Sequence, residues 1–165
     1  MNALVVFYSR TGTTRTVARR LARELGADIE ELTDPVHRLG LRGYLRSAFD
    51  AGLGRWVPVE PVTRDPTRYD LVIVGSPVWV SSVSAPVRTF LCNNARRLRK
   101  VAFFVTEGGR GDRRVFRQMA DVVGAKPAAT LALLQQDVER GSASTAITSF
   151  AASLRDDGVA AAMHA

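Results

Sequence analysis

The sequence has a single cysteine, Cys92, and two histidines among its 165 residues. One cysteine cannot close an internal disulfide, and two histidines are too few for a cluster of zinc ligands, so we expect neither. No apolar run approaches the roughly 18 residues that a membrane-spanning helix needs. The first apolar run, Ala3–Tyr8, is too short for a secretion signal, and no basic segment precedes it. These absences favour a cytoplasmic protein without a membrane span or a metal.

Lysine is also scarce, because only two of the 23 basic residues are lysines. With 16 acidic residues, the formal net charge is +7. This surplus excludes an acidic surface that docks on a basic partner. It does not predict a nucleic-acid partner, since the arginines are spread over several predicted helices and no aromatic residues alternate with them as a stacking platform requires.

Short apolar runs alternate with amphipathic segments along the chain. The apolar runs predict parallel strands at Ala3–Tyr8, Ile29–Leu32, Leu71–Val74, Val101–Val105 and Ala128–Leu134. We expect these strands to be buried on both faces, except for Ile29–Leu32, which is more polar and is typical of an edge strand. Apolar residues at helical spacing predict helices over Val17–Leu25, Leu41–Leu53, Val87–Leu98, Val115–Val123 and Ile147–Leu154. Strands that are each followed by a helix predict an α/β fold, a three-layer α/β/α sandwich with a five-stranded parallel sheet.

Length and composition bound the organisation of this fold. At 165 residues and 46% hydrophobic content, the chain is typical of one globular domain. We expect that domain to span residues 1–156, and residues 157–165 to form a flexible tail. Periodicity does not give the order of the strands, because the order 2-1-3-4-5 and a Rossmann half-fold both fit.

The loop after the first strand is rich in hydroxyl groups, Ser9-Arg10-Thr11-Gly12-Thr13-Thr14. Gly12 can adopt a positive φ, so that consecutive N–H groups turn towards one point. The helix that follows adds its unpaired N–H groups and the positive end of its dipole. This pattern favours a site for a phosphate, with Arg10 or Arg15 adding charge, over a plain turn capped by a threonine. The glycine-lysine pattern of a nucleotide-hydrolysing loop and the triple-glycine dinucleotide fingerprint are both absent.

Two further loops follow strands of the same predicted sheet. The loop Gly75-Ser76-Pro77-Val78-Trp79-Val80-Ser81-Ser82 contains Trp79, which either stacks on a flat ring or packs over the end of the sheet as core. The other loop is Thr106-Glu107-Gly108-Gly109-Arg110-Gly111-Asp112. It either exposes backbone groups that hydrogen-bond to the polar edge of a ring, or is a flexible connection with Asp112 as the cap of the next helix. Glu107 faces either a ring or solvent. Because ligands bind beyond the carboxyl ends of parallel strands, the three loops predict a site for a phosphate, a linker and a planar ring, which is the shape of flavin mononucleotide (FMN).

At these loops the sequence resembles the flavodoxin family. Ser9–Thr14 matches its phosphate-loop pattern, Gly75–Trp79 with Pro86 looks like the flavin loop of its short-chain members, and Gly40–Asp50 is similar to a stretch typical of them. The resemblance covers nearly the whole chain and implies the sheet order 2-1-3-4-5 and non-covalent FMN. It implies that the phosphate is held by Ser9, Arg10, Thr11, Gly12, Thr13 and Thr14. It also implies that the ring is lined by Pro77, Val78 and Trp79, with the backbone of Val78–Val80 near its N5, and that its pyrimidine side contacts Thr106, Glu107, Gly108 and Gly109.

Two departures from that family bear on function. Its electron carriers are strongly acidic, and they often hold a second aromatic residue in the loop after the fourth strand, which here has none between Thr106 and Asp112. An open flavin face suits a substrate. We therefore expect an FMN-dependent oxidoreductase that passes hydride or electrons from NAD(P)H or a reductase to a quinone-like or other small acceptor, with quinone reductases and protoporphyrinogen oxidases as the nearest examples. No side chain is predicted to act as an acid, a base or a nucleophile.

Two other functions stay open on the sequence alone. One is a flavodoxin-type electron carrier with an acidic redox protein as its partner and no substrate of its own. The other is a regulatory or interaction domain with an empty flavin site, since a fold does not fix a function. A homodimer is open as well, because the oligomeric state has no signature in the sequence.

Overall fold

The computed structural model describes residues 1–33 and 62–162, with the backbone alone for residues 157–162. Within these residues one sheet contains β1 (Ala3–Phe7), β2 (Asp28–Glu31), β3 (Leu71–Trp79), β4 (Ser82–Val83), β5 (Val101–Glu107) and β6 (Thr130–Leu134). The helices are α1 (Thr13–Leu25), α3 (Ala85–Asn94), α4 (Asp112–Val123), α5 (Gln135–Arg140) and α6 (Ser144–Ala162). Two 3-10 helices cover Pro66–Arg68 and Ala95–Arg97.

The long path of the sheet is parallel and has the order β2-β1-β3-β5-β6. The predicted α/β fold with a parallel sheet is therefore confirmed. The predicted five-stranded sheet is not what the structure has, because a sixth strand, β4, pairs antiparallel with the end of β3. The apolar run that predicts the third strand ends at Val74, because Gly75 and Pro77, which are typical of turns, follow it. In the structure β3 continues to Trp79, with Pro77 opposite Thr106 of β5.

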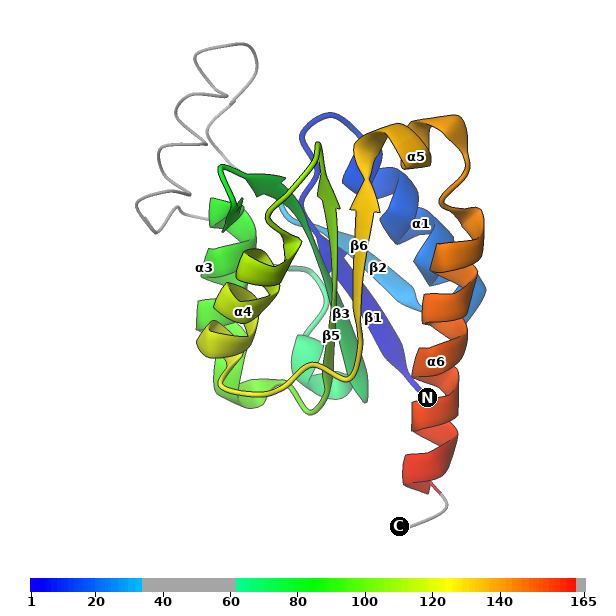
Figure 1. Cartoon of the computed structure of the whole chain (residues 1–165). Helices are drawn as coiled ribbons and strands as arrows, with labels where there is room; N and C mark the ends of the chain where they lie inside the picture. Colours follow the sequence, from blue (N-terminus) through cyan, green and yellow to red (C-terminus); the bar gives the residue numbers. More distant parts are fainter. Residues whose placement is uncertain (34–61, 163–165) are drawn as a thin grey trace.

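Helices cover both faces of this sheet, α3 and α4 on one face and α1, α5 and α6 on the other (Figure 1). Alternate residues of each strand enter the two cores. In β1, Leu4 and Val6 belong to the cluster with α3 and α4, whereas Val5 and Phe7 belong to the cluster with α1 and α6. All four side chains are buried. Burial on both faces explains why such strands appear in the sequence as unbroken apolar runs.

Several element boundaries differ from the predicted ones. The strand predicted over Ala128–Leu134 begins at Thr130, and α5 follows it without a loop. The sequence analysis missed α5 because this short helix has no buried residues and hence no apolar stripe. Helix α6 continues past residue 156 to Ala162, so it extends into the segment that was expected to be a flexible tail. The domain boundary at residue 156 stays a prediction. The predicted helix Leu41–Leu53 and the overlapping family-like stretch lie outside the described residues.

Two features are absent from the described part of the chain. No helix there combines the length and the apolar character needed to cross a bilayer. No three histidine, cysteine, aspartate or glutamate side chains of residues 1–33 and 62–156 gather where they could ligate a metal ion. Cys92, in α3, is a half-buried free thiol.

Candidate functional site

A pocket of about 230 Å³ lies between the loop after β1 and the carboxyl ends of β3 and β5. Because these strands are parallel, their carboxyl ends lie at the same edge of the sheet. The pocket is lined by Arg10, Thr11, Thr13, Thr14, Pro77, Val78, Trp79, Thr106, Glu107, Gly108 and Gln135. Of the predicted site residues, Ser9, Gly12, Val80 and Gly109 do not line it. The structure thus brings most of the predicted residues together, and their contact with a cofactor stays a prediction.

The loop between β1 and α1 is shaped from inside by Ser9. Its Oγ accepts hydrogen bonds from the backbone N–H groups of Gly12 and Arg15, each at 3.2 Å. Gly12 is the N-cap of α1 and has a φ of 100°, which glycine adopts without a steric penalty. Ser9 and Gly12 therefore fix the turn, while their neighbours line the pocket.

The first turn of α1 faces this pocket and suits an anion. The backbone N–H groups of Thr13 and Thr14 have no intrahelical acceptor, because they belong to the first turn. No acidic residue lies in that turn to compete for the positive end of the helix dipole. The hydroxyl groups of Thr14 and Thr106 form a buried hydrogen bond of 2.8 Å, which joins the loop to the end of β5. Thr11 and Thr13 also line the pocket, and neither takes part in that hydrogen bond.

The two arginines considered as counter-charges have different surroundings. Arg15 donates two hydrogen bonds to the Glu31 carboxylate, at 2.8 and 2.7 Å. This pairing raises the pKa of Arg15 and compensates its charge. Arg10 lines the pocket, whereas Arg15 does not. The structure therefore favours Arg10 as the cation for a bound phosphate.

Trp79 is held in place by packing. It is 8% exposed, belongs to the core cluster with α3 and α4, and meets Tyr8 edge-on with ring centroids 5.6 Å apart. Its remaining surface lines the pocket. Of the two roles that the sequence left open, core packing is therefore present, and stacking on a flat ring stays a prediction.

Val80 and Ser81 form the tight connection between β3 and β4. Both have positive φ values, 49° and 53°. Asparagine and glycine favour this hairpin backbone, whereas a β-branched valine is strained in it. Val80 is 65% exposed. Its side chain thus points to solvent at a turn beside the pocket.

We expect the double substitution Val80→Asn with Ser81→Gly to raise the free energy of unfolding by about 1–2 kcal/mol, because it removes strain at two positive-φ positions. Urea denaturation of the apoprotein measures the difference. An unchanged or lower free energy of unfolding would contradict the strained turn.

Glu107 is the charged residue of the pocket that the sequence could not place. It ends β5, is 8% exposed and lines the pocket, so it is not solvated. Its Oε2 has no hydrogen-bond partner among the described residues. Burial raises the pKa of Glu107, and the nearby charge of Asp112 raises it further, while the backbone N–H of Asp112 opposes the shift.

Gln135 lines the pocket and was missed by the sequence analysis. It is the first residue of α5, directly after β6, and its Nε2 donates to the Glu139 carboxylate at 2.6 Å. The rule that ligands lie beyond the carboxyl ends of parallel strands points to this position. The site predicted from the sequence covers only the loops after the first, third and fourth predicted strands.

The lining as a whole fits FMN. A helix N-terminus with threonine hydroxyl groups suits its phosphate. The apolar surface of Pro77, Val78 and Trp79 suits a flat ring, and the unpartnered oxygen of Glu107 offers a polar contact for the edge of that ring.

Known proteins similar to this chain share the fold and the family. The family model described as NADPH-dependent FMN reductase matches residues 2–135. A flavoprotein in complex with FMN from Lactobacillus acidophilus NCFM has a TM-score of 0.71 at 22% identity, over 84% of this chain and 97% of that chain. A flavodoxin from Streptococcus pneumoniae TIGR4 has a TM-score of 0.58 at 16% identity, over 95% of this chain and 99% of that chain. No curated protein sequence matches this chain significantly.

The two kinds of similarity carry different weight. At 22% identity or less, the solved structures show the flavodoxin-like fold alone. The family model spans most of the chain and includes the loops after β1, β3 and β5. It agrees with the resemblance to FMN-binding, flavodoxin-like proteins that these loops predict. The chain belongs to the NADPH-dependent FMN reductase family.

Proposed function

We propose that the protein is a cytoplasmic, FMN-dependent oxidoreductase that takes electrons from NADPH and passes them to a quinone-like small molecule. The observation that carries this proposal is the pocket, where a helix N-terminus, threonine hydroxyl groups and a flat apolar wall meet. The family supports NADPH as the donor and FMN as the cofactor. The lone thiol of Cys92 is compatible with the reducing cytoplasm.

The residues of the pocket have separate roles in this proposal. The N–H groups at the start of α1, the hydroxyl groups of Thr11 and Thr13, and the Arg10 guanidinium would hold the phosphate. Pro77, Val78 and Trp79 would line the ring and exclude water from it. When bound, FMN supplies the two-electron chemistry that amino-acid side chains lack. The chain binds and orients the reactants.

An open ring face is what favours an enzyme over a carrier. The loop from Gly108 to Gly111 follows β5 directly and contains no aromatic side chain. A second flat molecule therefore meets no ring from this loop on its way to the pocket. A small acceptor such as a quinone fits this arrangement.

Steady-state oxidation of NADPH by the FMN-loaded protein, with a benzoquinone as the acceptor, tests the proposal. We expect quinone-dependent oxidation that saturates in both substrates and exceeds the rate with free FMN by at least roughly 100-fold. The matched control is the same protein loaded with FMN and given NADPH without an acceptor under anaerobic conditions. A loaded protein that oxidises no NADPH with quinones, nitro compounds or free flavins would contradict the enzyme function.

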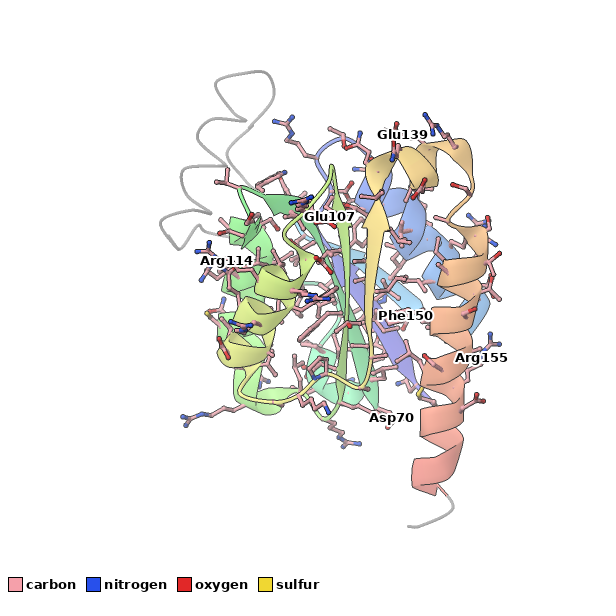
Figure 2. All side chains as sticks on the ribbon, in the orientation of Figure 1. Asp70, Glu107, Arg114, Glu139, Phe150 and Arg155 are labelled. Atoms are coloured by element: carbon pink, nitrogen blue, oxygen red, sulfur yellow. The ribbon has the colours of Figure 1, made fainter. Side chains whose placement is uncertain are left out.

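A positive surface near the pocket favours one second candidate, an electron carrier with an acidic protein partner. Four exposed arginines lie around the start of α4: Arg110, Arg113, Arg114 and Arg117. Figure 2 places Arg114 on the outer side of α4, away from the sheet. Opposite charges on two proteins accelerate their association, and salt screens this effect.

The carrier is tested with an acidic flavoprotein reductase as the electron donor. Carrier function predicts that the transfer rate falls steeply with ionic strength and that Arg113→Glu with Arg114→Glu lowers it at low salt. Lys126→Glu changes an exposed charge beyond the end of α4 and serves as the control. A rate that depends on neither salt nor the paired substitution argues against an acidic partner at this surface.

A further inference from the structure

Glu107 is a buried carboxyl group at the end of the sheet where the strands finish (Figure 2). Its side chain lines the pocket, and its Oε2 has no hydrogen-bond partner among the described residues. Buried polar atoms are otherwise almost always paired, since an unpaired one is unfavourable. Glu107 is therefore a side chain of the pocket lining whose hydrogen bonding is incomplete, and an atom of the ligand is expected to complete it.

The charged groups around Glu107 have both signs, and together with burial they favour its neutral form. Asp112, at the start of α4, brings a negative charge, and Arg10, on the loop after β1, brings a positive charge to the same pocket. The residues lining the pocket from β3 are Pro77–Trp79, and α5 contributes Gln135, so neither element adds an ionisable group to the lining. Burial and the charge of Asp112 raise the pKa of Glu107. A phosphate bound at the other end of the pocket adds negative charge and acts in the same direction.

We propose that Glu107 stands in the pocket as a neutral carboxylic acid and donates a hydrogen bond through Oε2 to a carbonyl oxygen on the polar edge of the bound ring. This inference rests on the proposed function, in which that ring is FMN. It makes Glu107 a residue that selects ligands with a carbonyl group at that edge. Deprotonation removes the donor and places a negative charge against the carbonyl oxygen, so flavin binding weakens as the pH rises.

The direction in which flavin affinity changes with pH distinguishes a neutral Glu107 that donates a hydrogen bond from an ionised Glu107 that accepts one. A carboxylate that accepts a hydrogen bond from a ring N–H would bind flavin more tightly as the pH rises. The stability of the apoprotein is also expected to fall as the pH rises. Because the folded pKa of Glu107 lies above the roughly 4.3 of an unfolded glutamate, its stabilising contribution is full below that value and is lost as the pH rises through the folded pKa.

The test is the dissociation constant of the apoprotein for riboflavin, measured by quenching of flavin fluorescence between about pH 5 and about pH 9. Riboflavin carries the same ring as FMN without a titrating phosphate. We expect the affinity of the unchanged protein to fall at least roughly tenfold over this range. Glu107→Gln keeps a neutral donor, so its affinity should stay within about threefold of the low-pH value throughout. Asp121→Asn, on the outer side of α4, changes an exposed carboxylate that does not line the pocket and should behave like the unchanged protein.

A second measurement reports on Glu107 without any flavin. Urea denaturation of the apoprotein over the same pH range should show stability falling as the pH rises, with a smaller fall in Glu107→Gln. Riboflavin affinity that is independent of pH, or that rises with pH, while flavin still binds would overturn the neutral-acid role and leave the proposed function intact. Folded apoprotein that binds neither riboflavin nor FMN at any pH would instead overturn the proposed function and, with it, this inference.

Discussion

Replacing Gly12 by aspartate is expected to raise the dissociation constant for FMN by at least roughly 100-fold, which is about 2.7 kcal/mol. Two effects add. The φ of Gly12, 100°, is one that other residues rarely adopt, so the loop is strained by any side chain. A carboxylate there also repels the phosphate, by about 3 kcal/mol per pair of unit charges at roughly 5 Å and an effective dielectric constant of about 20. Titration of FMN fluorescence with apoprotein measures the loss.

Gly26→Asp is the matched control for this substitution. Gly26 caps the C-terminal end of the same helix, also with a positive φ, 61°, and does not line the candidate pocket. The control therefore adds the same charge away from the site, with a milder backbone strain. We expect it to lower the stability while the dissociation constant for FMN stays within about twofold. If both variants lose FMN to the same degree, the loss comes from global destabilisation and the phosphate-loop assignment is wrong.

Gly75→Ala is expected to lower the free energy of unfolding by about 3 kcal/mol, although Gly75 does not line the candidate pocket. A Cβ at this position would lie 2.1 Å from Cζ and 2.4 Å from Cε1 of Phe104. Phe104 is fully buried on β5, directly opposite Gly75 of β3. Its ring cannot retreat without disturbing a closely packed core, so the added methyl group is destabilising. Urea denaturation of the apoprotein measures the effect.

Phe104→Leu tests whether this ring is the cause. A smaller side chain makes room for the methyl group, so the two substitutions together should be less destabilising than the sum of each alone, by at least about 1 kcal/mol. Gly109→Ala is the control, because nothing lies within 4 Å of a Cβ there, and its stability should change by less than about 1 kcal/mol. Additive effects of the pair, or a Gly75→Ala protein as stable as the original, would contradict the packing argument.

The sequence carries much of the information for the fold because the strands are buried on both faces. Val101–Val105 is apolar without interruption, and β5 does span these residues. The phosphate loop could be located for a related reason, since hydroxyl residues and Gly12 follow directly after the buried strand β1. Both signals are local in sequence.

The features that could not be predicted from the sequence depend on which residues of different strands face one another. The sequence pattern places Gly75 in the loop after the third predicted strand, whereas the register between β3 and β5 places Phe104 against it. The hairpin to β4 was missed because Val80 and Ser81 are not typical turn residues. Trp79 could be assigned to the core only once its edge-on contact with Tyr8 was seen.

Anaerobic mixing of the FMN-loaded protein with NADPH tests most directly the central claim, that this pocket holds FMN where NADPH can reduce it. We predict that the visible absorbance of the oxidised flavin disappears, at a rate that saturates with NADPH concentration, and returns when a quinone is added. Dithionite serves as the control, because it reduces bound flavin whatever the natural donor is. A bound flavin that dithionite bleaches and NADPH leaves oxidised would contradict the account.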